Sequence, residues 1–366
     1  GVLATMNGST EAAKLGTNGN TGHLAKASLK DINSPADMRI LPIENLPSIA
    51  NEVRQLLIKT CASNGGHIGA NLGVVELTMA VHYVFNTPKD KVIFDTSHQT
   101  YVHKIITGRR DQFPTLCKYP GGLSRFIIRG ENEYDLFSAG HASTGLSAAM
   151  GFAEAAKHQK ADFQTVCIVG DGALSGGMAY EALNNMGYNQ TDITIVLNDN
   201  KMSISHNVGA MFEYLKRLSD VASDDQARRS IGTIFEKLGF KYYGPIDGHN
   251  FEELIHHLNE MKHIKGPKIL HVLTDKGRGM DYMENDKVTW HEHAAFDVET
   301  GRPLAQRGNH KAPLPSVEAT AINTLMQLAE KDKTIVGLTA AMAAGTCMNK
   351  FGEKFPERFY DVGIAE

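Results

Sequence analysis

Two apolar runs, each ending in a polar triplet, constrain the fold more than any other feature of the chain. The run Val166–Val169 ends at Gly170-Asp171-Gly172, and the run Ile193–Leu197 ends at Asn198-Asp199-Asn200. A helix-like segment separates the runs, so the pattern predicts two parallel strands joined by a crossover helix. The carboxyl ends of parallel strands meet at one edge of a sheet, where α/β proteins bind ligands. We therefore expect Asp171 and Asn200 to meet at such an edge.

The residue types at this edge indicate a cation. Carboxylate and amide oxygens suit Mg²⁺ or Ca²⁺, and Mg²⁺ is usually held by one or two protein groups together with phosphate oxygens and water. Two other interpretations stay open. A dinucleotide-binding turn would need glycine at Ser175 and would place a carboxylate against phosphate, and Gly170-Asp171-Gly172 could also form a purely structural turn.

The spacing resembles the thiamine diphosphate motif, a GDG followed 25 to 30 residues later by asparagine. Here the separation from Asp171 to Asn200 is 200 − 171 = 29 residues. The resemblance implies that Asp171, Asn200 and the backbone carbonyl of Met202 bind Mg²⁺. It also implies that the turn Gly170, Asp171, Gly172 and Ala173 contacts the cofactor, whose diphosphate is held by the metal.

Composition limits the other classes of function. The formal net charge is −4 and 21% of residues are charged, so no global basic field favours nucleic acid or an anionic membrane. No apolar run approaches the 18 residues of a membrane span. The four cysteines are scattered without a C-x-x-C pair, which argues against a zinc site or a disulfide framework and favours a reducing compartment.

The strand, polar turn and helix order recurs along the chain and predicts a doubly wound, mostly parallel α/β sheet. Val92–Phe94 and Ile269–Leu273 end in further polar turns, and Tyr134–Phe137 leads into Gly140-His141-Ala142-Ser143-Thr144. We expect helices from Leu46 and over 75–85, with a glycine-rich loop at 63–73 between them. The expected domains are a flexible lead-in (1–35), a first domain (36–300), a linker (301–314) and the incomplete beginning of a second α/β domain (315–366).

Seven motifs together resemble the 1-deoxy-D-xylulose-5-phosphate synthase family, within the transketolase-like group. They occur in the family's order, as GGHIGANLG, DTSHQTYVHK, GHAST, GDG with LNDNKMSIS, GPIDGH, KGRG and YDVGIAE. The resemblance implies a diphosphate-binding domain followed by the start of a pyrimidine-binding domain, and a homodimer. It implies condensation of pyruvate with D-glyceraldehyde 3-phosphate and loss of CO₂, which feeds isoprenoid, thiamine and pyridoxal synthesis. A bacterial cytoplasm or a plastid stroma fits this activity.

The same resemblance assigns the remaining site residues. His67, His98 and His291 match active-site histidines, and His98 and His141 match cofactor contacts together with Gly140, Ser143 and Lys276. Glu366 matches the glutamate that hydrogen-bonds the aminopyrimidine ring. For each histidine the alternative is a loop residue bonded to backbone, and for Lys276 it is an exposed lysine. Histidines suit the proton transfers because an unperturbed imidazole titrates near pH 6.5.

Some features depart from the family. Glycine is usual at Ser97, the loop 124–129 is more basic than expected, and the stretch 209–235 is short. The third domain and most of the second are missing, so we expect a longer product or a complementary chain to complete the site. The alternatives are a transketolase-type enzyme that moves two carbons without decarboxylation, a non-catalytic cofactor-binding fragment, and a dehydrogenase.

Overall fold

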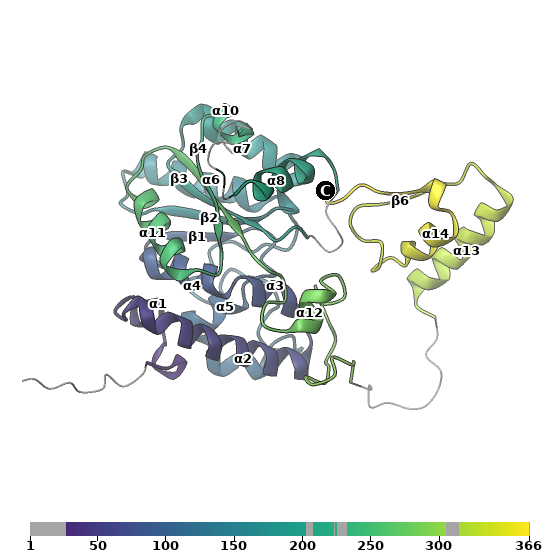
Figure 1. Cartoon of the computed structure of the whole chain (residues 1–366), viewed down its shortest axis with the longest axis horizontal. Helices are drawn as coiled ribbons and strands as arrows, with labels where there is room; N and C mark the ends of the chain where they lie inside the picture. The colour runs from purple at the N-terminus through teal and green to yellow at the C-terminus, as the bar shows by residue number, and fades with distance from the viewer. Residues whose placement is uncertain (1–26, 203–207, 223, 225–232, 305–314, 366) are drawn as a thin grey trace, which may run out of the picture.

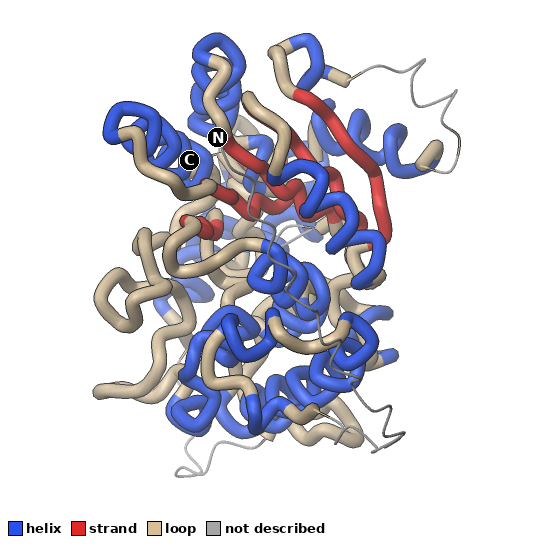
Figure 2. The backbone as a smooth tube through the Cα atoms, turned by 90° about the vertical axis from the view of Figure 1, so that its left-hand side faces the viewer, coloured by secondary structure: helices blue, strands red, loops and turns tan. Residues whose placement is uncertain are grey.

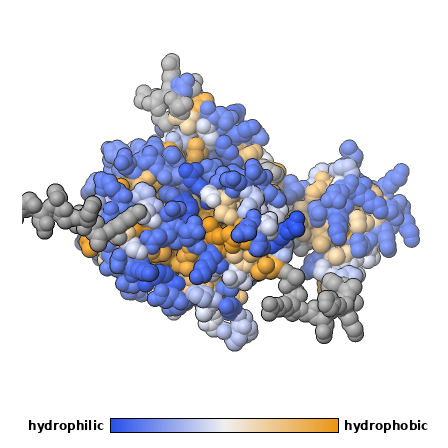
Figure 3. Space-filling view, turned by 60° about the horizontal axis from the view of Figure 1, so that its bottom comes forward, coloured by the Kyte–Doolittle hydropathy of each residue, from blue (hydrophilic) through white to orange (hydrophobic). Residues whose placement is uncertain are grey.

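The structure, a computed structural model, describes residues 27–202, 208–222, 224, 233–304 and 315–365. Within these residues the chain forms a larger unit up to residue 304 and a smaller unit from residue 315, which lies to the right in Figure 1. Hydrophilic side chains dominate the larger unit in the view of Figure 3, and apolar ones gather on the part nearest the smaller unit.

The larger unit is built on a five-stranded sheet in the order β1-β2-β3-β5-β4, and every neighbouring pair is parallel. Its strands are β1 (Lys91–Phe94), β2 (Thr165–Gly170), β3 (Ile193–Asp199), β4 (Lys241–Asp247) and β5 (Pro267–Leu273). The two strands predicted from the runs at 166–169 and 193–197 are confirmed as β2 and β3, joined by the crossover helix α7 (Gly177–Asn189). The predicted strands at 92–94 and 269–273 are confirmed as β1 and β5.

Helices cover both faces of this sheet, as Figure 2 shows for the red strands between blue layers. The helices of the larger unit besides α7 are α1 (Pro35–Arg39), α2 (Leu46–Asn64), α3 (Ile68–Gly73), α4 (Val75–Val84), α5 (Tyr101–Lys104), α6 (Gly145–Gln159), α8 (Ala210–Asp220), α10 (Ile234–Lys237), α11 (Phe251–Lys262) and α12 (Asp281–Asn285). Alternate residues of β2 point into different cores. Val166 and Ile168 join the cluster formed with α2, α4 and α11, whereas Cys167 and Val169 join the cluster formed with α6 and α7. A strand buried on both faces explains the unbroken apolar run.

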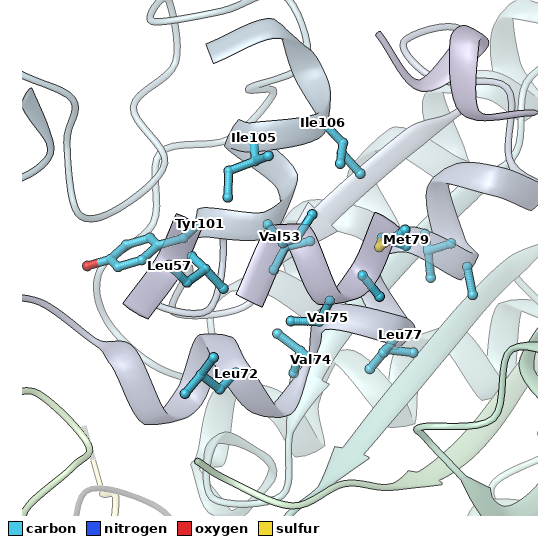
Figure 4. Packing of buried hydrophobic residues seen from close by; sticks show 14 of the residues in the cluster. Val53, Leu57, Leu72, Val74, Val75, Leu77, Met79, Tyr101, Ile105 and Ile106 are labelled. Carbon is cyan, nitrogen blue, oxygen red and sulfur yellow. The ribbon is translucent and has the colours of Figure 1, made fainter. Parts of the chain in front are cut away.

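The core beneath the glycine-rich segment is closely packed. Leu72, Val74 and Val75 lie against Val53 and Leu57 of α2 (Figure 4), and all five side chains are buried. This packing places α3 and its preceding residue His67 firmly against the body of the larger unit.

Three local expectations are corrected by the structure. Residues 68–73 form helix α3, so only the first part of the predicted loop is a loop. Residues 134–137 form no strand. Their buried Asp135 instead accepts hydrogen bonds from Arg109 and contacts His103, so a polar network fixes the segment. Strand β4 was not predicted.

Part of the expected lead-in belongs to the core. Leu29 and Ile32 are buried in the main cluster, and the hydroxyl of Ser28 donates to Glu52 Oε2 at 2.8 Å. Ordered packing therefore extends at least to residue 28, earlier than the boundary expected after residue 35. The rest of the expected lead-in, residues 1–26, lies outside the described residues.

The smaller unit contains α13 (Val317–Lys331), β6 (Gly337–Thr339), α14 (Met348–Lys354) and β7 (Phe359–Asp361). Strands β6 and β7 form a parallel pair, and their inner face packs on α13 and α14 through Ile322, Met348 and Phe351. Strand β6 begins at Gly337. Within the described residues, no helix combines the length and apolar character needed to cross a membrane.

Candidate cofactor and active site

A cavity of about 850 Å³ opens at the carboxyl ends of β1, β2, β3 and β5. Loop 340–345 of the smaller unit, together with Ile364 and Ala365, lines it as well. The predicted residues that line the cavity are His67, His98, Gly140, His141, Gly170, Asp171, Gly172, Ala173, Asn200, Met202, Lys276 and His291. Residues spread over more than 220 positions of sequence therefore meet at one place.

The ends of β2 and β3 bring the expected metal ligands together. The backbone N–H of Asp171 donates to Asn198 O at 3.1 Å, which joins the two strand ends. Asn200 Oδ1 accepts the N–H of Met202 at 3.0 Å, so its amide is oriented by the turn that follows β3. The described residues contain no cluster of three or more His, Cys, Asp or Glu side chains suited to a metal. The expected set is different, because it combines one carboxylate with an amide and a backbone carbonyl.

Electrostatics around Asp171 fit a cation. The carboxyl is buried, and burial together with the neighbouring carboxylate of Asp199 raises its pKa well above the usual range. A divalent ion held by these oxygens would lower the pKa of Asp171 again, because a bound cation is the largest charge in such a site. The residues present thus fit Mg²⁺ held by oxygen ligands.

A buried chain of polar contacts next to the expected metal ligands was not predicted from the sequence. Asp199 Oδ2 lies 3.0 Å from His271 Nε2, and Tyr242 Oη lies 2.7 Å from His271 Nδ1. His271 is fully buried in the middle of β5. The sequence does contain a signal for these contacts, namely a histidine within an otherwise apolar strand. A buried imidazole needs a hydrogen-bond partner in the core.

Three of the predicted histidines form one cluster. The ring centroids of His67 and His98 are 5.5 Å apart, those of His67 and His291 are 5.6 Å apart, and those of His98 and His291 are 5.1 Å apart. Burial lowers the pKa of His67 to about 4, even though the carboxylate of Glu292 opposes the shift. Burial and the positive charge of Lys276 also lower the pKa of His98 and of His291. All three imidazoles are therefore neutral at pH 7.

The low pKa of His67 predicts a pH-dependent stability. The unfolded chain takes up a proton near pH 6.5, whereas the folded chain does so only near pH 4. Below pH 6.5 the unfolded state therefore binds more protons, and stability falls as the pH falls. We expect His67 alone to remove about 2 kcal/mol between pH 7 and pH 5. Urea unfolding of the wild type and His67→Gln at both values measures this, and equal losses in the two proteins would contradict the prediction.

Two polar atoms in the cavity wall fit a bound organic cofactor. His98 Nδ1 and Gln99 Oε1 are buried and have no hydrogen-bond partner among the described residues. Both residues line the cavity. Since buried polar atoms in proteins are nearly always paired, a ligand that carries both donors and acceptors would satisfy them.

Lys276 is buried at the end of β5 rather than exposed. Its Nζ lies 2.9 Å from His291 Nδ1, and burial lowers the pKa of the amine to about 7, against the opposing attraction of Asp171. A diphosphate would supply the negative charge that favours the ammonium form.

Two predicted residues lie apart from the cluster, and a third lies outside the described residues. Ser143 does not line the cavity, because its hydroxyl donates to Ala173 O at 2.6 Å and its side chain is buried. His141 lines the cavity but is exposed and lies outside the three-histidine cluster. Glu366 lies outside the described residues. Their roles stay predictions.

Two of the departures from the family pattern, Ser97 and the basic loop 124–129, meet in space. Ser97 has a positive φ of 71°, a conformation that favours glycine. Its hydroxyl donates to Ala139 O and accepts the N–H of Ile127, so it holds the basic loop 124–129. In that loop Arg125 forms an ion pair with Glu292, whose other carboxylate oxygen lies 3.5 Å from His67 Nε2. Neither Arg125 nor Glu292 was predicted from the sequence.

Comparison with solved structures supports the fold. A transketolase from Campylobacter jejuni aligns with a TM-score of 0.55 and 20% identity over 70% of this chain and 41% of its own. A transketolase from Leishmania mexicana aligns with a TM-score of 0.54 and 17% identity over 87% of this chain and 48% of its own. The doubly wound parallel α/β fold is thereby confirmed, and at these identities the likeness concerns the fold alone.

Sequence comparison identifies the family. The family model described as 1-deoxy-D-xylulose-5-phosphate synthase matches residues 29–232 and 222–274. A protein of that name from Macrococcus caseolyticus is 46% identical over 92% of this chain and 58% of its own length. One from Listeria monocytogenes is 48% identical over 92% of this chain and 55% of its own. The chain spans little more than half the length of these relatives, and it belongs to the 1-deoxy-D-xylulose-5-phosphate synthase family.

Proposed function

We propose that this chain carries the diphosphate-binding half of a thiamine diphosphate site. The complete enzyme would condense pyruvate with D-glyceraldehyde 3-phosphate, with loss of CO₂, to give 1-deoxy-D-xylulose 5-phosphate. The observation that carries the proposal is the convergence of Asp171, Asn200 and the histidine cluster on one cavity. Family membership supports it, because relatives of that name match over 92% of this chain.

Some residues of this chain would bind the metal ion and the cofactor, and others would transfer protons. Oxygens of Asp171, Asn200 and Met202 would hold Mg²⁺, and Lys276 would contact the diphosphate. When bound, thiamine diphosphate supplies a carbon nucleophile and accepts the electrons released by decarboxylation. His67 is buried and His98 and His291 are half-buried. All three are neutral, so each can accept a proton or orient a hydroxyl or carbonyl group of the substrate.

Release of CO₂ from pyruvate is the test of the proposed reaction. The chain, supplied with the C-terminal portion of a relative, is expected to release CO₂ in a reaction that depends on the aldehyde acceptor. Two-carbon transfer without CO₂ would favour the transketolase-type alternative. Cofactor binding with no turnover would favour a non-catalytic fragment, and a nicotinamide absorbance change would favour a dehydrogenase.

Replacing His67 should affect turnover without affecting the metal site. In the completed enzyme His67→Ala is expected to lower turnover by roughly 100-fold or more, the range for lost acid-base groups. Steady-state kinetics measure this, and calorimetry checks that Mg²⁺ and cofactor still bind. His158→Ala, which removes an exposed histidine at the end of α6, is the matched control. A near-wild-type rate for His67→Ala would leave His67 as a loop histidine with no part in the reaction.

A further inference from the structure

The GPIDGH segment, residues 244–249, is linked through His249 to the turn that carries Lys276. His249 lies in the connection between β4 and α11, and its side chain is only 4% exposed. Its Nδ1 lies 3.1 Å from Glu76 Oε2 on α4. On the other side of the ring, Nε2 accepts the backbone N–H of Asp275 at 2.9 Å. The ring therefore bridges a buried carboxylate and the residue immediately before Lys276.

These two contacts fix the tautomer of His249. A backbone N–H can only donate, so Nε2 must offer its lone pair and the ring proton must be on Nδ1. That proton points at Glu76, which also accepts a hydrogen bond from Arg54 Nη2 at 2.6 Å. Although burial opposes it, the hydrogen bonds from His249 and Arg54 lower the pKa of Glu76 to about 2. Glu76 is therefore a permanent acceptor, as in the carboxylate–histidine pairs that orient ligands in metal sites.

The turn that carries Lys276 is held from several sides. Thr274 N–H donates to Asp199 O at 3.0 Å, and its hydroxyl donates to Asn198 Oδ1 at 2.6 Å. Gly277 N–H donates to Gly69 O at 2.9 Å, which joins the turn to α3. In the part of the chain that the structure describes, the N–H of Asp275 donates to His249, while the carbonyl of Asp275 accepts the N–H of Arg278 at 3.2 Å. Loss of His249 would remove the hydrogen bond that holds the Thr274–Asp275 peptide on its N–H side.

We propose that His249 is a positioning residue: it holds the Asp275 peptide so that the side chain of Lys276 enters the cofactor cavity, while Glu76 fixes the tautomer that makes this possible. The role of Lys276 toward the diphosphate rests on the proposed function. The geometry that places it does not, because it consists of contacts within this chain.

A second cavity makes the idea testable without unfolding the protein. It has a volume of about 360 Å³ and lies on the outer side of the ring, lined by Glu76, His249, Asn250 and Phe251 among others. A smaller side chain at 249 therefore borders space that water already reaches. The N-cap of α11 is a separate group, since Asn250 Oδ1 accepts the N–H groups of Glu252 and Glu253.

Two conservative variants separate the two contacts of the ring. In His249→Gln the side-chain carbonyl reaches the position of Nε2 and can still accept the Asp275 N–H. In His249→Asn the amide nitrogen lies near Nδ1 and can still donate to Glu76, but the side chain is too short for Asp275. The matched control is His256→Ala, because His256 is an exposed histidine on the adjacent helix α11.

Cofactor affinity and amide exchange are the two measurements. With Mg²⁺ present, calorimetry is expected to show thiamine diphosphate binding close to wild type for His249→Gln and His256→Ala. Thiamine diphosphate binding should be ~10-fold weaker for His249→Asn, which is the lower end of the range for residues that orient a ligand. Without cofactor, hydrogen exchange followed by mass spectrometry should be faster at 274–277 in His249→Asn only.

The outcomes distinguish this inference from the proposed function. If wild type binds the cofactor and Lys276→Ala weakens binding, equal behaviour of the Gln and Asn variants at 249 overturns the positioning role. If wild type shows no binding, the proposed function fails, while the exchange rates at 274–277 still decide whether His249 holds the turn. Restoration of slow exchange in His249→Ala by added imidazole, but not by 1-methylimidazole, would support the two-sided contact.

Discussion

Replacing Asp171 with alanine should abolish the Mg²⁺-dependent binding of thiamine diphosphate by this chain. The carboxyl of Asp171 is buried beside Asp199, and the turn after β2 places it at the cavity. An anionic diphosphate next to these carboxylates is repelled until a metal ion intervenes. We expect the affinity to fall by roughly 100-fold or more, beyond the effect of residues that only orient a ligand. Calorimetry with and without Mg²⁺ measures it.

The controls for this variant separate charge from structure. Asp171→Asn keeps an oxygen ligand without the charge, so it should bind more weakly than wild type and more tightly than Asp171→Ala. Asp162→Ala removes a carboxylate whose side chain is 97% exposed, and it should change nothing. Equal affinity of the wild type in the presence and absence of Mg²⁺ would refute the assignment of the metal site.

The strand pair at the centre of the site was predictable because its signal is local. A strand covered on both faces must be apolar at every position, and the polar triplet marks where it leaves the core. Every residue of β2 and β3 except Gly170 is buried, and the runs at 166–169 and 193–197 are apolar apart from Thr194. Parallel pairing then places Asp171 and Asn200 at one edge without further information.

Strand β4 could not be predicted because its signal is weak. It is the edge strand of the sheet, and its residues range from exposed to buried without a regular alternation. Gly244 and Pro245 interrupt the run, and the register shifts between Tyr243 and Ile246. Proline within a run normally argues against a strand and is tolerated mainly at edges and bulges. The segment is a strand because it pairs with β5, and the sequence pattern does not reveal this pairing.

The run Tyr134–Phe137 failed as a strand for a different reason. Asp135 lies in a buried network in which Arg109 donates two hydrogen bonds to its carboxylate. Partners for a buried charge come from distant parts of the chain, so the pattern of apolar residues does not reveal them. The contact between Asp199 and His271 was missed on the same grounds, while His67, His98 and His291 were identified through the family resemblance.

The smaller unit leaves one face of its sheet uncovered in the described residues. Leu338 of β6 and Tyr360 of β7 pair in register and share a face with Val336, just before β6, and Val362, just after β7. These four residues are 47 to 64% exposed. The opposite face packs on a cluster of four buried residues. Parallel sheets are stable when both faces are covered. We expect this face to be covered by the part of the relatives that lies outside the match, which is more than 40% of their length.

This 366-residue chain, purified alone, should therefore not turn over pyruvate. Loop 340–345 of the smaller unit forms one wall of the cofactor cavity, and a unit with so small a core cannot hold that wall in place. Misplacement of reacting groups by about 1 Å can lower a rate about 100-fold. Adding the C-terminal portion of the Macrococcus relative, fused or as a separate chain, should restore CO₂ release that depends on the aldehyde acceptor.

The surface variant Leu338→Asp tests whether the uncovered face is the reason. It places a charge where the added portion would dock, so it should prevent restoration while leaving Mg²⁺-dependent cofactor binding by the larger unit intact. The matched control is Tyr188→Asp, which changes an exposed aromatic residue of α7 in the larger unit at 88% exposure. Robust turnover by the purified chain, with its length verified by intact mass, would show that this chain alone completes the site. Restoration that survives Leu338→Asp would instead show that the added portion docks elsewhere on the chain.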